Sequence, residues 1–180
     1  MIYAINEQAG SVHALSFFIN TFILYMDVVK NRQDYANALS QSVSHLSEGY
    51  WVTLNAISKN EISFNSHLQE LANRLNIFCY GNKYRNGLKR FEIRGAIQLG
   101  HAYEGLHTHI VVLKNGHTDR TDLEVEEFIR THWYRLVGAQ GCIWGSLVDF
   151  QPVSDVAARI RYAVRDFRPN FDQRNQLIYL

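Results

Sequence analysis

Two histidines and one tyrosine are the residues of this chain that most clearly suggest chemistry. His107 and His109 are separated by a single residue within the run LHTHIVVL, which is rich in β-branched residues. Because residues two apart in a strand point to the same side, both imidazoles are expected on one face of a sheet. Neutral imidazole is a common ligand of divalent metal ions. The pair therefore predicts part of a metal site, although such a pair alone, among eight histidines, is more often incidental.

The histidine pair needs a further donor to complete one side of a metal site. His101 is the nearest candidate, because a turn over residues 102–106 would place it cross-strand from His107 on the same face. A register shifted by one residue would turn His101 away. Glu104, Gln98 and Glu92 remain alternatives as the third ligand.

Tyr162 lies in a segment with helical periodicity near the end of the chain. Val156, Ile160 and Ala163 can pack on its apolar side, so Tyr162 could simply add aromatic core area. Alternatively, its phenolic oxygen could attack a phosphodiester if a metal ion polarises the phosphate. Arg165 follows three residues later and shares the helical face. It could neutralise the phosphate or form a surface ion pair, and the spacing permits both.

Alternating strand and helix patterns predict the elements that position these residues. Helical periodicity covers residues 11–46, with a second helix over residues 34–46. The strands are predicted at residues 49–57, 91–101, 106–113 and 142–150, and the helices at residues 63–80, 121–138 and 154–166. Ser154 is the expected cap of the last helix.

The order of these elements predicts an α+β fold with a ferredoxin-like (RRM-like) antiparallel sheet. A β-α-β-β-α-β order places two helices on one face of the sheet and leaves the other face available, with the hairpin strands in the centre. A helix carrying the tyrosine follows. We therefore expect an N-terminal helical segment over residues 1–47 and a catalytic domain over residues 48–180.

Composition indicates a packed domain without a global attraction to nucleic acid. The chain has 180 residues, 47% hydrophobic and 19% charged, with a formal net charge of +1. Any nucleic-acid surface must therefore come from a local basic patch. Cys79 and Cys142 are too few for a disulfide framework, which favours the cytoplasm. The most apolar run, residues 15–26, is shorter than a membrane span and lacks signal-peptide features, so no membrane partner is expected.

Three short motifs resemble those of the HUH single-strand endonucleases, in particular plasmid and viral rolling-circle replication initiators with one catalytic tyrosine. In chain order they are residues 51–55 (WVTLN), residues 107–111 (HTHIV) and residues 162–165 (YAVR). Thr108 stands at the middle position, which is usually hydrophobic in the family, and Arg165 stands where the family usually carries lysine. The family's acidic third ligand precedes the histidine pair, where this chain offers Gly100 and His101. A site of three histidines would be similar to that of the related relaxases.

The resemblance implies a metal-dependent nickase of single-stranded DNA. Tyr162 would form a 5′-phosphotyrosine and release a 3′-hydroxyl, Mg²⁺ or Mn²⁺ would be the cofactor, and Arg165 would assist. The substrate would be single-stranded DNA or an origin hairpin in a bacterial host or a virus-infected cell. With no G-x-x-x-x-G-K motif, the chain would rely on a host helicase and polymerase.

Residues with polar, basic or aromatic side chains are candidates for DNA contact. They are Thr53, Asn55, Lys83, Tyr84, Arg85, Lys89, Arg90 and Arg161, with Arg94 as a further phosphate contact. The main alternative is a non-catalytic nucleic-acid-binding module on the same fold, in which exposed sheet aromatics such as Trp51 stack on bases. A transposase or a relaxase could share the histidine pair and the tyrosine.

Overall fold

The described part of the chain is an antiparallel sheet with helices on both of its faces. The computed structural model describes residues 32–56, 60–99, 105–139, 147–164 and 177–180. Its elements, in chain order, are α2 (Arg32–Ser42), β1 (Gly49–Asn55), α3 (Glu61–Tyr80), α4 (Asn82–Arg85), β2 (Arg90–Leu99), β3 (Leu106–Asn115), α5 (Asp122–Leu136), β4 (Val148–Pro152), α6 (Val156–Ala163) and β5 (Leu177–Tyr179). The α+β class expected from the sequence is confirmed.

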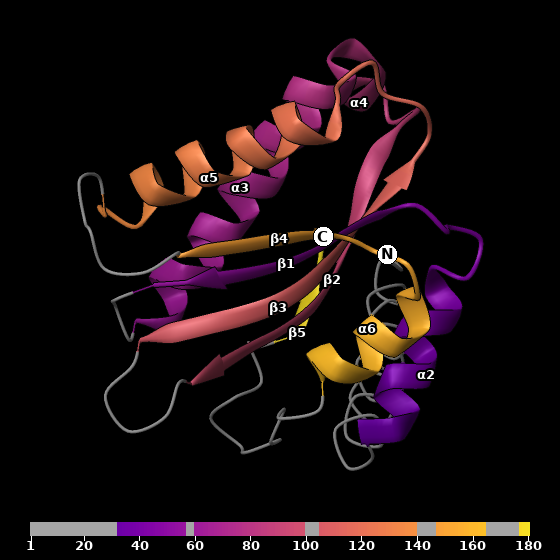
Figure 1. The fold of residues 1–180 in the computed structure, drawn as a ribbon, viewed down its shortest axis with the longest axis vertical. Coiled ribbons are helices and arrows are strands. Elements are labelled where there is room, and N and C mark those ends of the chain that lie inside the picture. Colours follow the sequence, from indigo (N-terminus) through magenta and orange to yellow (C-terminus); the bar gives the residue numbers. More distant parts are fainter. Residues whose placement is uncertain (1–31, 57–59, 100–104, 140–146, 165–176) are drawn as a thin grey trace, which may run out of the picture.

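The strands lie in the order β4-β1-β3-β2-β5, and every neighbouring pair is antiparallel (Figure 1). The first four strands and the helices α3 and α5 follow the predicted β-α-β-β-α-β order, which is compatible with a ferredoxin-like fold. Both hairpin strands, β2 and β3, have a neighbour on each side, as predicted. The short strand β5 was not expected from the sequence.

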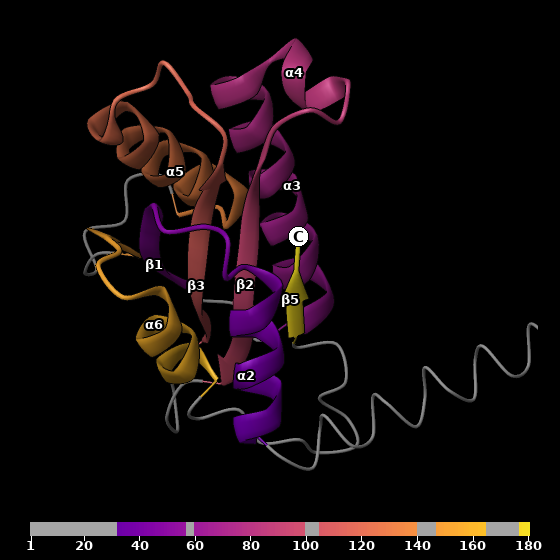
Figure 2. The ribbon, with the colours of Figure 1, turned by 90° about the vertical axis from the view of Figure 1, so that its right-hand side faces the viewer.

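Two apolar clusters lie on opposite faces of the sheet. On one face, α3 and α5 pack through residues such as Phe64, Leu75 and Trp133. On the other face, Trp51 and Val111 of the sheet pack against α2 and α6 (Figures 1 and 2). The prediction that this second face stays available is therefore wrong in part. The N-terminal segment contributes α2 to its cover, and residues 1–31 lie outside the described residues.

The sequence pattern located the two helices α3 and α5 well. Gly81 follows α3 with a positive φ of 53°, which glycine adopts readily, and its N–H donates to Ile77 O. Thr121 caps α5 in a capping box with Glu124. Within the described ranges, no helix is both long enough and apolar enough to cross a membrane. The apolar run at residues 15–26 lies outside those ranges.

The last predicted strand was placed too early in the chain. The pattern indicated residues 142–150, whereas β4 runs over Val148–Pro152, and residues 140–146 lie outside the described residues. Pro152 is tolerated because β4 is an edge strand, where a missing N–H interrupts no ladder. Thr108, the residue between the two histidines, lies buried on the face of α3 and α5. Its hydroxyl donates to Ala96 O at 2.7 Å, which satisfies this polar group in a buried environment.

The cap of α6 differs from the predicted one. Asp155, not Ser154, is the N-cap residue, and its carboxylate accepts a hydrogen bond from Ala158 N at 2.8 Å. The helix ends at Ala163, earlier than predicted, and Arg165 lies outside the described residues. At eight residues, α6 is too short to be stable alone, so its position depends on its cap and its packing.

We expect Asp155→Ala to lower the free energy of unfolding by about 1 kcal/mol, because it removes the acceptor for an otherwise unpaired helical N–H. Urea denaturation followed by circular dichroism measures the change. Ser154→Ala is the matched control and should leave the midpoint unchanged. An equal loss in both variants would contradict the assignment of Asp155 as the cap.

Candidate metal and tyrosine site

The two histidines lie on β3 as predicted, but the residue opposite them differs from the expected one. His107 and His109 share the face of α2 and α6, and their ring centroids are 5.3 Å apart. The register pairs His107 with Gln98 of β2, and Leu106 already belongs to the strand. The expectation that His101 lies cross-strand from His107 is therefore wrong. His101 and Glu104 lie outside the described residues.

Gln98 makes a direct contact with the histidine pair. Its Oε1 lies 3.0 Å from Nε2 of His107, and its Nε2 donates to the carbonyl oxygen of Ala163 at 2.9 Å. A carbonyl oxygen only accepts, so the amide nitrogen must face Ala163 and the amide oxygen must face His107. Among the residues that the structure describes, no three His, Cys, Asp or Glu side chains form a group that could hold a metal ion. Gln98 thus places an amide oxygen, which could serve as a metal ligand, beside His107.

Neighbouring strand residues fix the orientation of His109. The hydroxyl of Thr53 on β1 lies 2.9 Å from Nδ1 of His109. The indole ring of Trp51 stacks on the same imidazole, with ring centroids 5.2 Å apart and planes inclined by only 9°. These contacts direct the other nitrogen of His109, Nε2, away from Thr53. Asn55 lies opposite His107 in the register, on the same face.

Tyr162 lies beside the histidine pair. Its ring centroid is 5.4 Å from that of His109 and 5.6 Å from that of Trp51. The side chain is 42% exposed, whereas its helical neighbours Ile160 and Ala163 are buried. Tyr162 therefore stands at the surface of the site rather than within the core, which argues against a role in core packing alone.

Arg159 is a part of the site that the sequence reasoning missed. Its guanidinium carbon lies 5.3 Å from the centroid of the Trp51 ring, and it donates to Gln151 Oε1 at 3.3 Å. Arg159 precedes Tyr162 by three residues, the same spacing that made Arg165 a candidate on the other side. That spacing was the signal that could have identified it.

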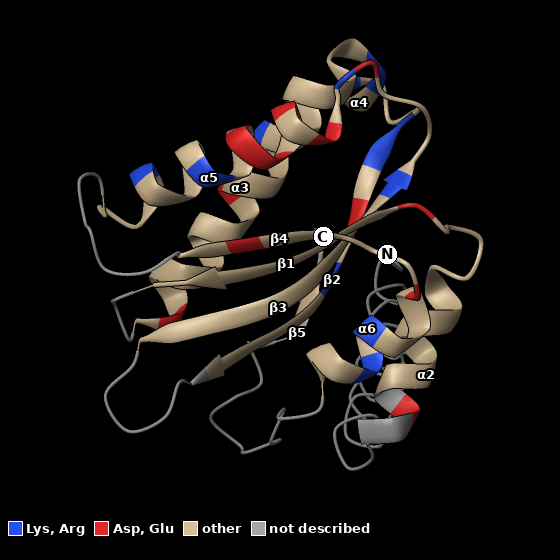
Figure 3. Ribbon diagram, in the orientation of Figure 1, with Lys and Arg blue, Asp and Glu red and all other residues tan. Residues whose placement is uncertain are grey.

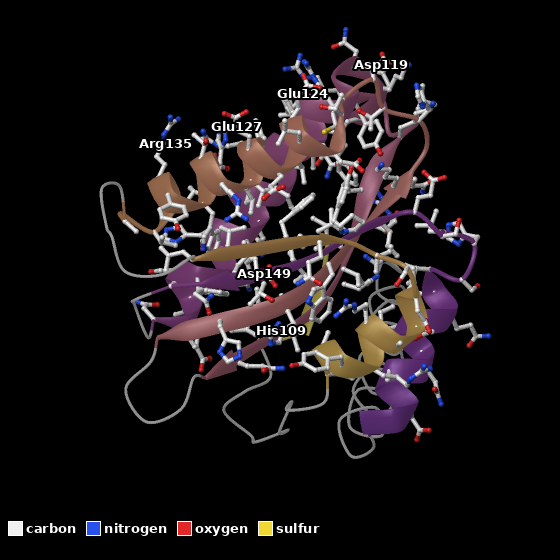
Figure 4. All side chains as sticks on the ribbon, in the orientation of Figure 1. His109, Asp119, Glu124, Glu127, Arg135 and Asp149 are labelled. Atoms are coloured by element: carbon white, nitrogen blue, oxygen red, sulfur yellow. The ribbon has the colours of Figure 1, made fainter. Side chains whose placement is uncertain are left out.

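Asp149 is a second residue that the sequence reasoning did not single out. The register places Thr53 between Asp149 of β4 and His109 of β3, so the three side chains share one face (Figure 4). Its carboxylate is exposed and accepts a hydrogen bond from Gln151 Nε2 at 3.0 Å. Asp149 therefore adds a negative charge at the edge of the site.

Two residues on β2 that were candidates from the sequence belong to a buried ion pair. Glu92 bonds to Arg94 at 2.7 Å and to Arg90 at 2.6 Å. Burial alone would raise the pKa of Glu92, but the hydrogen bonds from the two arginines outweigh it and hold the pKa below the usual value. Arg94 is only 3% exposed and also donates to the carbonyl oxygens of Ile93 and Leu180. Neither the metal role for Glu92 nor the phosphate role for Arg94 fits these contacts.

The basic residues between Lys83 and Arg90 lie far from the two histidines. Arg90 and Gln98 stand near the two ends of β2, roughly 27 Å apart at the rise of an antiparallel strand. Figure 3 shows the positive residues around α4 and the start of β2 apart from those on α6. Of the candidates for DNA contact, Thr53, Asn55 and the exposed Arg161 lie at or next to the site. The others lie at the far end: Lys83, Tyr84, Arg85, Lys89 and Arg90.

In comparisons with known proteins, the chain matched no protein-family model, no curated protein and no solved structure.

Proposed function

We propose that this protein is a metal-dependent nickase and strand transferase of single-stranded DNA, with Tyr162 as the nucleophile. The observation that carries the proposal is the contact between the rings of Tyr162 and His109, 5.4 Å apart, which joins two motifs more than fifty residues apart in the chain. A core aromatic and an incidental histidine pair would not need to meet at a partly exposed position. The resemblance of three short motifs, in chain order, to those of HUH endonucleases supports the same function, and the strand order is compatible with the ferredoxin-like fold expected for it.

The residues present fit a Mg²⁺ or Mn²⁺ ion held by His107, His109 and Gln98. The two histidines would supply imidazole nitrogens, and Gln98 would supply the amide oxygen that lies beside His107. His109 would bind through Nε2, because its Nδ1 contacts Thr53. An ion bound there would polarise the scissile phosphate as a Lewis acid.

The side chains around the site would carry out the remaining steps. The phenolic oxygen of Tyr162 bonds to phosphorus, the bond from phosphorus to the 3′-oxygen breaks, and the proton lost by the phenol is balanced by the one gained by the 3′-hydroxyl. Thr53 and Trp51 hold His109 in place. Arg159 and Arg161 lie on the tyrosine helix, where their charges favour an approaching phosphate. The phosphotyrosine bond retains the energy for later strand joining.

The buried position of Trp51 argues against the alternative of a non-catalytic binding module. Such a module on this fold presents aromatic rings on an open sheet face. Trp51 is 3% exposed and lies against α6, and the hydroxyl of Tyr84 donates to Asn73 on α3. A replication initiator acting in the cytoplasm with a host helicase and polymerase is the biological setting that we propose, and a transposase or relaxase would use the same chemistry.

The test is the formation of a covalent adduct between the protein and DNA. The full chain is incubated with a pool of labelled single-stranded DNA hairpins and Mn²⁺, and samples are resolved on a denaturing gel. We expect an adduct that disappears when a chelator is added, and peptide mass mapping should place the nucleotide on Tyr162. DNA binding without an adduct across the pool would favour the binding-module alternative.

The hydroxyl of Thr53 is expected to tune metal affinity without touching the metal. Thr53→Val removes the partner of His109 Nδ1, and loss of such a partner typically weakens metal binding about 10- to 100-fold. Titration with Mn²⁺ followed by electron paramagnetic resonance measures the affinity. Thr53→Ser keeps the hydroxyl and should bind Mn²⁺ like the wild type. Equal affinities for Thr53→Val and the wild type would contradict this role.

A further inference from the structure

The side chain of Gln98 links the histidine pair to the helix that carries Tyr162. Its side chain is 6% exposed and reaches two elements at once, β3 through His107 and α6 through Ala163. A buried amide with both of its polar groups bonded is costly to disturb, because each group left unpaired loses its hydrogen bond without gaining water. Both contacts therefore restrain the same planar group.

The contact with Ala163 lies at the end of α6 where the helix lacks partners of its own. Ala163 is the last residue of α6, so its carbonyl oxygen accepts no hydrogen bond from within the helix. Gln98 supplies the donor from outside. Ala163 also directly follows Tyr162, so this bond anchors the turn that carries the tyrosine.

We propose that Gln98 is a positioning residue that couples the metal site to the tyrosine helix, so that occupation of the site and the placement of Tyr162 depend on each other. The inference rests on the proposed function and deepens it. In the metal-free protein, His107 Nε2–H donates to Gln98 Oε1. With a metal ion in the site, that oxygen would instead be a ligand of the ion, while the nitrogen of the same amide would still donate to the carbonyl oxygen of Ala163. The coupling is reciprocal, as linkage between two sites requires.

Gln98→Glu separates the two halves of this role. A carboxylate of the same length still offers an oxygen beside His107, but it has no hydrogen to donate and would face the carbonyl oxygen of Ala163. We expect Mn²⁺ affinity at least equal to that of the wild type. The rate of adduct formation at saturating Mn²⁺ should fall roughly 100-fold, the effect of displacing a reacting group by about 1 Å.

Hydrogen exchange tests the coupling without any DNA. In the wild type, Mn²⁺ should slow exchange of the backbone amides of α6. In metal-free Gln98→Glu these amides should exchange about tenfold faster, the effect of losing one hydrogen bond. Added Mn²⁺ should no longer slow them. Gln98→Met, which introduces no buried charge, should lose the α6 response and part of the Mn²⁺ affinity.

Asp155→Ala is the matched control, because it loosens the other end of α6 without touching Gln98. It should keep the response of α6 to Mn²⁺ and form adduct at more than a tenth of the wild-type rate. If Asp155→Ala slows the adduct as strongly as Gln98→Glu, or if α6 in Gln98→Glu and Gln98→Met still responds to Mn²⁺ as in the wild type, the coupling is refuted. If the wild type forms no adduct, the proposed function fails, and the exchange measurements still decide the coupling.

Discussion

Tyr162→Phe should abolish the covalent adduct with single-stranded DNA, reducing it by at least about a thousandfold. The substitution removes only the proposed attacking oxygen of the ring that lies beside His109. Because the phenyl ring can keep its edge contacts with Trp51 and His109, the fold should not change. The rate of adduct formation on a denaturing gel, at saturating DNA and Mn²⁺, measures the effect.

Tyr80→Phe provides the control for this substitution. Tyr80 is buried at the end of α3, where its hydroxyl donates to Gly116 O at 3.3 Å, at the opposite end of β3 from the histidines. It should form adduct at the wild-type rate. An adduct that persists in Tyr162→Phe would assign the nucleophile to another residue and refute the role of Tyr162.

His109→Ala should remove metal-dependent activity almost completely. Polarisation of a phosphoryl oxygen by a metal ion contributes several kcal/mol to the stability of a transition state, and 4 kcal/mol corresponds to about a thousandfold in rate. The substitution removes one of the proposed donors and also the ring on which Trp51 stacks. We expect the Mn²⁺ affinity, measured by titration, and the rate of adduct formation to fall together. Excess Mn²⁺ should restore the rate only in part.

His117→Ala controls for the loss of a histidine as such. His117 is 83% exposed beyond the far end of β3, where it lies 3.2 Å from Asp119. Its removal should change neither Mn²⁺ affinity nor the adduct rate. A His109→Ala variant that binds Mn²⁺ like the wild type would show that the ion lies elsewhere.

Periodicity located most of the elements and the two key groups of the site. The two-residue spacing of His107 and His109 fixed their common face, because strand geometry leaves no alternative within one strand. The spacing within the last helix likewise identified Ile160 and Ala163 as its buried residues, but it did not decide whether Tyr162 joins the core or the site.

Features that depend on contacts between elements could not be predicted from local patterns. The partner of His107 depends on the hairpin register, and a turn that differs in length by a few residues exchanges His101 for Gln98. The burial of Arg94 depends on its ion pair with Glu92, two residues away on the same strand. It also depends on its hydrogen bond to the carbonyl oxygen of Leu180, which is distant in the sequence. The cap of α6 lay one residue from the predicted one, because Ser and Asp are comparable caps and only the path of the chain chooses between them.

The length of β2 sets a minimum span for any DNA that reaches both ends of the sheet. The basic residues near Arg90 and the site at Gln98 are separated by roughly 27 Å, which corresponds to about eight base pairs of duplex at 3.4 Å each. A short oligonucleotide cut at the site could not reach the basic end. Substrates with longer stems or flanks should therefore gain affinity stepwise at about that length, and binding titrations against a ladder of DNA lengths would reveal the threshold.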